Sequence, residues 1–127
     1  MRNVRTLVSA VLTLALAAGC TSNPKPSAQQ AIVDRETAAI APSVARAKTR
    51  YKSVVMGSDI RGSTLLISID AEGLSEMDTD AEDGLLAGFL TDWKRVWLKA
   101  NPGKHAKLVV EFQNYYGQEE VSRSAKV

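Results

Sequence analysis

The segment from Asp80 to Ala100 constrains the fold more than any other part of the chain. Its large apolar residues recur at steps of three and four, which places them along one side of an α-helix: Leu85, Leu86, Phe89, Leu90, Trp93, Val96, Trp97 and Ala100. A helix with such a wide apolar stripe must cover an apolar surface. We therefore expect Trp93 and Trp97 in a core, the alternative being that one of them faces outward.

Both ends of this helix are marked in the sequence. Thr79 and Glu82 have the spacing of a capping box, and Asn101-Pro102-Gly103 ends the segment. Acidic residues gather at its start and basic residues near its end, as the helix dipole favours: Lys94, Arg95 and Lys99.

Alternating apolar and polar residues predict a strand on each side of this helix. Residues 64–70 place Leu65, Ile67 and Ile69 on one face, and residues 107–113 do the same with Leu108, Val110 and Phe112. Residues 119–124 add a short edge strand.

Residues 51–60 fit two structures. They could extend a preceding helix that ends at Gly57, or form a strand that pairs through Arg61-Gly62 with the next one. The β-favouring residues 52–56 favour the strand.

The region before it, residues 28–50, is rich in Ala, Gln, Arg and Lys with sparse apolar positions. It predicts a helix up to about Ala41, an interruption at Pro42 and a second turn or helix from Ser43.

Together these elements predict an α+β fold in two layers. One long amphipathic helix packs on a small sheet of three or four strands, preceded by an N-terminal helical segment, in a single domain over residues 31–127. The sequence pattern leaves open the order of the strands, and whether 64–70 and 107–113 are parallel neighbours.

The N-terminus carries an export signal. Arg2 and Arg5 precede a short apolar run, Leu7 to Ala18, and the small residues 17–19 stand directly before Cys20, the only cysteine. This resembles the signal peptide and lipobox of bacterial lipoproteins, although Ala17 stands where that family prefers Leu. The resemblance implies cleavage after residue 19 and acylation of Cys20, with palmitate among the attached chains.

Two other interpretations of the same segment are possible. One is an ordinary secretory signal cut after Ala18 or Gly19. The other, an uncleaved membrane helix, needs about 20 apolar residues, whereas this run has about a dozen. In Gram-negative lipoproteins a residue other than Asp after the cysteine, here Thr21, implies the outer membrane, facing the periplasm. Residues 20–30, with Pro24 and Pro26, then form the lipid anchor and a flexible tether.

Charge excludes nucleic acid as a partner. Removing residues 1–19 from the 127-residue chain leaves 108 residues, the size of one small domain. The whole chain has 16 Lys and Arg against 14 Asp and Glu, and the loss of Arg2 and Arg5 leaves 14 against 14. A neutral mature chain lacks the basic surplus of nucleic-acid binders.

The residues needed for common catalytic and metal sites are scarce. His105 is the only histidine and Cys20 the only thiol, so nucleophilic triads and zinc sites have too few members. Residues 78–84 of the acidic stretch resemble the opening of an EF-hand loop. Counting from Asp78, however, places Asp83 at position six and Phe89 at position twelve, where Gly and Glu are required. We predict no catalytic residue, no metal and no cofactor.

Two features suit a partner surface. Arg46, Lys48 and Arg50 form a basic block without intervening acids, and Tyr115-Tyr116 sits at a turn where adjacent side chains cannot both point inward.

These features predict a binding or structural module anchored to the cell envelope through acylated Cys20, with an envelope protein or polymer as its partner and no catalysis of its own. Two alternatives stay open. A small enzyme acting on glycan or peptidoglycan needs a close pair of carboxylates facing a cleft. A small-ligand carrier needs an apolar cavity between helix and sheet.

Overall fold

The computed structural model describes residues 27–127. The elements in chain order are α2 (Ala28–Arg50), β1 (Val55–Arg61), β2 (Thr64–Ile69), α3 (Ala71–Ser75), α4 (Thr79–Ala100), β3 (Lys107–Gln113) and β4 (Glu119–Lys126). The proposed signal peptide, Cys20 and most of the tether lie outside these residues. No helix within 27–127 is long and apolar enough to cross a membrane.

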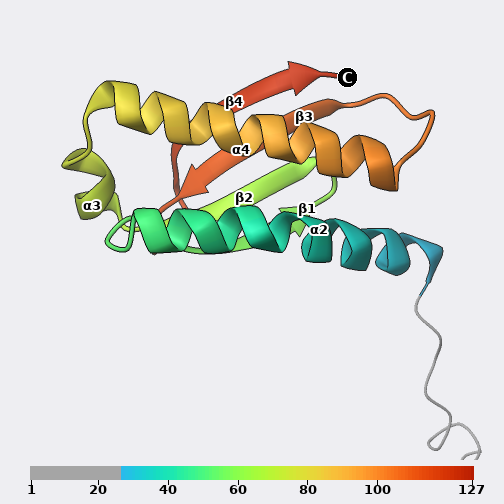
Figure 1. Ribbon diagram of the computed structural model, residues 1–127, viewed down its shortest axis with the longest axis horizontal. Coiled ribbons are helices and arrows are strands. Elements are labelled where there is room, and N and C mark those ends of the chain that lie inside the picture. Colours follow the sequence, from blue (N-terminus) through green and yellow to red (C-terminus); the bar gives the residue numbers. More distant parts are fainter. Residues whose placement is uncertain (1–26) are drawn as a thin grey trace, which may run out of the picture.

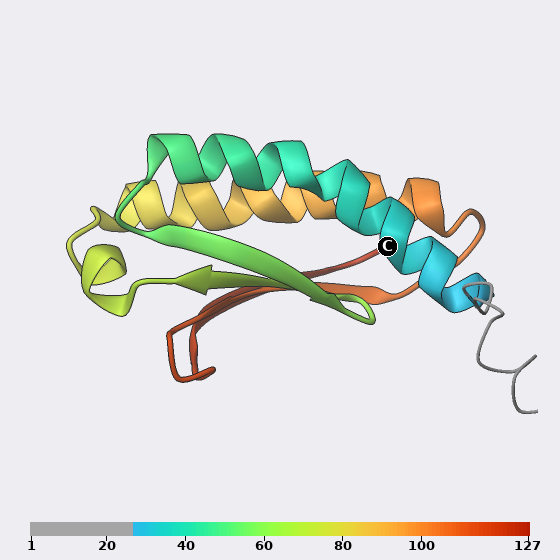
Figure 2. The ribbon, with the colours of Figure 1, turned by 90° about the horizontal axis from the view of Figure 1, so that it is seen from below.

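The fold is α+β in two layers, as predicted. The four strands follow the order β1-β2-β3-β4, with β2 and β3 parallel and the two outer pairs antiparallel. The connection from β2 to β3 passes through α3 and α4. Figures 1 and 2 show α2 and α4 side by side on one face of the sheet, running in opposite directions.

The core lies between this helix pair and the sheet. The inward residues of β2 and β3 are fully buried: Leu65, Ile67, Ile69, Leu108, Val110 and Phe112. Phe89 meets Phe112 edge-on, with ring centroids 6.1 Å apart. Trp93 is fully buried and its indole Nε1 donates to the Ser63 carbonyl oxygen at 2.9 Å. Trp97 is also buried, so the alternative of an outward tryptophan is wrong.

The predicted interruption at Pro42 is wrong, because α2 is one continuous helix with Pro42 inside it. Ile40 before the proline and Val44 and Ala47 after it are all buried in the core. This packing on both sides of Pro42 outweighs the hydrogen bond that the proline cannot donate. The helix bends about midway along its length (Figure 2), as expected for an internal proline.

Residues 51–54 form a turn and β1 follows, so the strand interpretation of this region is confirmed. β1 and β2 pair up to Arg61 and Thr64, and Gly62 takes a φ of 59° in the turn between them. The predicted edge strand is β4, which runs slightly longer, to Lys126.

The predicted capping box does not form. Thr79 is the first residue of α4, and Asp78 is the N-cap, with no hydrogen bond from its side chain to the helix. The short helix α3 was not predicted. In α3, Gly73 packs so closely on the Ser53 carbonyl group that a Cβ at this position would clash with it.

Candidate functional site

An open groove lies between α2 and α4. Its volume is about 590 Å³. It follows the C-terminal half of α2 and the N-terminal half of α4, and its lining is Ser43, Arg46, Ala47, Arg50, Tyr51, Asp80, Ala81, Gly84, Leu85, Gly88, Phe89 and Asp92. We call this the α2–α4 groove.

Two glycines give the groove its space. Gly84 and Gly88 lie one turn apart on α4, both exposed, and a Cβ added at either would meet no atom within 4 Å. Each glycine inside a helix costs about 1 kcal/mol relative to alanine. The packing of the domain does not require them, and their missing side chains leave the groove open.

The base of the groove is apolar, and its two sides are charged. Ala47 and Phe89 are buried, and Leu85 is half-buried beside them. Arg46 and Arg50 stand on the α2 side, whereas Asp80 and Asp92 stand on the α4 side. The groove therefore offers an apolar base between a basic and an acidic wall.

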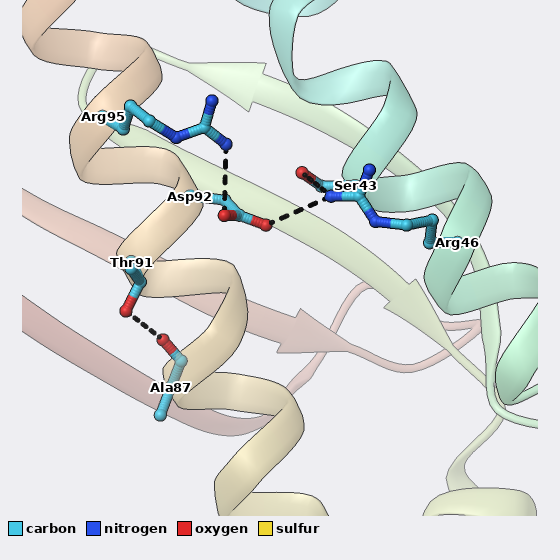
Figure 3. Close-up of polar contacts among 6 residues, drawn as sticks. All are labelled: Ser43, Arg46, Ala87, Thr91, Asp92 and Arg95. Atoms are coloured by element: carbon cyan, nitrogen blue, oxygen red, sulfur yellow. Dashed lines mark hydrogen bonds and ion pairs between the residues drawn. The ribbon is translucent and has the colours of Figure 1, made fainter.

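Figure 3 shows how the two walls are linked where Asp92 lies. The carboxylate of Asp92 lies 3.9 Å from Arg46 on α2 and 3.2 Å from Arg95 on α4. The guanidinium of Arg46 also donates to Ser43 Oγ at 3.3 Å. Asp92 thus bridges two cations, and its charge is neutralised within the domain.

Arg50 and Asp80 are placed differently. The Arg50 guanidinium lies over the Tyr51 ring, 5.4 Å from its centroid. Within residues 27–127, neither Arg50 nor Asp80 has an ion-pair partner within 4.0 Å. One cation on the α2 wall and one carboxylate on the α4 wall are therefore available to a ligand.

The structure divides the predicted partner residues among three places. Arg46 and Arg50 line the α2–α4 groove, whereas Lys48 is exposed on α2 outside that lining. Tyr115 and Tyr116 lie in the turn between β3 and β4, on the side of the sheet away from the helices (Figure 2). Both rings are exposed as predicted, to 87% and 83%.

Hydrogen bonds of the Asn114 side chain close the backbone of the β3–β4 turn that carries these rings. Asn114 Oδ1 accepts from the backbone N–H groups of Tyr116 and Gln118, at 2.9 and 3.1 Å, while its Nδ2 donates to Glu120 Oε1 at 2.8 Å. Gly117 closes the turn with a φ of 75°. The two tyrosine rings meet edge-on with centroids 5.6 Å apart.

The candidate residues for catalysis or metal binding are dispersed. His105 is exposed, with its Nδ1 3.2 Å from the carbonyl oxygen of Val127. In the part of the chain that the structure describes, no three His, Cys, Asp or Glu side chains gather closely enough to hold a metal ion.

One buried carboxyl carries no signal in the sequence pattern and was not predicted. Glu36 on α2 is 2% exposed, and its Oε2 has no hydrogen-bond partner among the described residues. Burial raises the pKa of Glu36 above its ordinary value, and Asn101 lowers it to a smaller degree. Glu36 lies outside the lining of the α2–α4 groove.

Only Arg46 and Arg50 of the groove lining were predicted as site residues, and the residues that were missed include Tyr51, Asp80, Gly84 and Gly88. A signal for the glycines was present, because two helix-weakening residues sit one turn apart in the most strongly patterned helix. Comparisons with protein-family models, with curated proteins and with solved structures found no match to this chain.

Proposed function

We propose that this chain is a lipoprotein of the cell envelope, anchored through acylated Cys20, whose domain binds an envelope partner and catalyses no reaction. The single observation that carries the binding role is the α2–α4 groove, an open hollow with an apolar base and oppositely charged walls. The signal segment and Cys20 support the anchor by their resemblance to bacterial lipoproteins.

The position of the groove suits an anchored domain. The described chain enters α2 at one end of the molecule, and the C-terminal half of α2 with the start of α4 lies at the other (Figure 1). The 23 residues of α2 span about 34 Å at 1.5 Å per residue. An anchor on Cys20 therefore leaves the groove, and the β3–β4 turn beyond the sheet, on the side facing away from the attachment point.

The chemistry of the groove supports binding over catalysis. The hydroxyl of Ser43 accepts a hydrogen bond from Arg46 and is buried, and the Asp92 carboxylate is shared by two arginines. These pairs hold both groups in place as parts of a charged wall. The groove is also open and lies between the helices, unlike the enclosed helix–sheet cavity that a small-ligand carrier needs.

The proposal is tested by crosslinking the full lipidated chain in its own cells, followed by purification. We expect a reproducible envelope partner, with less of it recovered when Arg46→Glu and Arg50→Glu are combined. Lys48→Glu is the control for each of the two single variants, since it makes the same charge change as either of them on the same helix outside the groove. Absence of any partner, together with turnover of a peptidoglycan fragment by the purified protein, would overturn the proposal.

A further inference from the structure

We propose that the α2–α4 groove binds an amphipathic α-helix of a protein partner. This partner helix is about three turns long. It carries an acidic side chain on the flank that meets Arg50 and a basic side chain on the flank that meets Asp80. The inference rests on the proposed function, because it names the class of ligand that the same groove takes.

The dimensions of the groove fit a row of side chains. Its lining on α4 runs from Asp80 to Asp92, which corresponds to about 18 Å along the helix axis. A compact ligand would leave much of this length empty, whereas one apolar ridge of a helix, with residues every three or four positions, follows it.

A helix fits these walls better than an extended peptide. Both walls are helices whose backbone N–H and C=O groups are already bonded internally, so an extended chain would find no backbone partners there. A helical ligand brings its own backbone hydrogen bonds with it. The exposed Gly84 and Gly88, one turn apart, also allow a helix backbone to approach α4 closely, as small residues do at other helix–helix contacts.

Charge sets the flanks of the ligand. Arg46 and Asp92 are paired with one another across the groove, so they add little preference of their own. Arg50 and Asp80 have no ion-pair partner within the described residues and stand on opposite walls. A partner helix with an acidic residue opposite Arg50 and a basic residue opposite Asp80 gives each of them an ion-pair partner. Like charges at these positions would repel and disfavour binding.

The chain itself does not supply the occupant. Two copies placed groove to groove would bring two concave surfaces together and leave a void at the contact. Residues 20–26 join the domain at the start of α2, far from the groove, and seven residues reach at most about 25 Å. That length brings them to the near end of the groove at best and does not let them lie along it.

The test places a photo-crosslinking amino acid in the full lipidated chain in its own cells. One variant carries it at Ala81 in the groove lining, a second at Tyr116 in the β3–β4 turn, and a control at Ala45, which is exposed on α2 outside the lining. Mass spectrometry then identifies the residues crosslinked in the partner. From position 81 we expect one segment with apolar residues at helical spacing and opposite charges on its two flanks.

A synthetic peptide of that segment gives the second readout. We expect it to gain helicity on binding the full chain, and Arg50→Glu to weaken its Kd by about tenfold or more. A peptide with the facing acid changed to Lys should recover binding to Arg50→Glu, and Lys48→Glu should leave the Kd unchanged. A Cβ added at Gly88 would meet no atom within 4 Å, so we expect Gly88→Leu to fold and to block binding.

The outcomes separate this inference from the proposed function. Crosslinks from position 81 to an extended segment, to lipid or to a second copy of the chain would overturn the inference. Capture of a partner from position 116 but not from 81 would also overturn it, while leaving the binding module in place. Absence of crosslinks to any envelope protein or polymer from both positions would contradict the proposed function itself.

Discussion

Gly84 and Gly88 lie one turn apart on α4 and line the groove, where an added Cβ at either would meet no atom within 4 Å. We therefore expect Gly84→Ala and Gly88→Ala each to raise the free energy of unfolding by about 1 kcal/mol, since alanine favours the helix and no clash opposes it. Urea unfolding of the single variants measures this effect. A loss of stability in both would show that the glycines serve the domain's own packing.

Gly73→Ala is the matched control, because the same substitution there places a Cβ against the Ser53 carbonyl. It should lower the free energy of unfolding by on the order of 1–3 kcal/mol, as overpacking does. Opposite signs at Gly73 and Gly88 would distinguish a structural glycine from one that leaves room for a ligand.

Truncation of the aromatic stripe of α4 should destabilise the domain strongly. Trp93→Ala removes a fully buried ring and its hydrogen bond to Ser63, and Phe89→Ala removes the edge-on contact with Phe112. Each should cost on the order of 3–5 kcal/mol, enough to unfold a small domain. If either variant kept its melting temperature, the helix would not be part of the core.

Glu36 gives the domain a distinctive pH dependence. Its pKa is raised in the folded state by burial, so the folded state favours the protonated form. The contribution of Glu36 to stability is therefore fully present below its ordinary pKa of 4.5 and is lost as the pH rises through the higher folded pKa.

Replacing the Glu36 carboxyl by a neutral amide should remove the loss of stability at higher pH. We expect Glu36→Gln to be more stable than the native chain at pH 7, with a difference that shrinks toward zero as the pH falls below about 4.5. Denaturant unfolding of both chains across this range measures the difference directly. A Glu36→Gln variant that is less stable at pH 7 would mean that the charged carboxylate has a favourable partner.

Acylation of Cys20 is tested on the precursor. The resemblance to lipoproteins predicts that Cys20→Ser blocks lipid attachment and leaves the chain uncut, which is visible as a heavier band that does not incorporate labelled palmitate. Normal cleavage of Cys20→Ser to a soluble periplasmic product would instead support an ordinary secretory signal.

Strong local periodicity explains what the sequence predicted well. The alternation in residues 64–70 and 107–113 identified the inward faces of β2 and β3, and the stripe over 80–100 identified the buried face of α4. In each case a single face had to be covered, so the local pattern was decisive.

Features that depend on distant contacts were missed. The propensity of Pro42 predicted a break in α2, but the buried residues on both sides of it hold the helix together. Likewise, the groove arises because α2 and α4 lie beside one another in opposite directions. No local sequence pattern predicts this arrangement. The basic block was found as a unit, yet only Arg46 and Arg50 of its three members face that groove.

The most direct measurement of the central claim compares Arg50→Glu with Lys48→Glu in the full lipidated chain. Both variants make the same charge change on α2, and only Arg50 lines the groove. In quantitative crosslinking and pull-down from cells, binding through the groove predicts that Arg50→Glu loses most of the partner while Lys48→Glu retains it. Equal recovery of the partner with both variants would contradict a binding site in the α2–α4 groove.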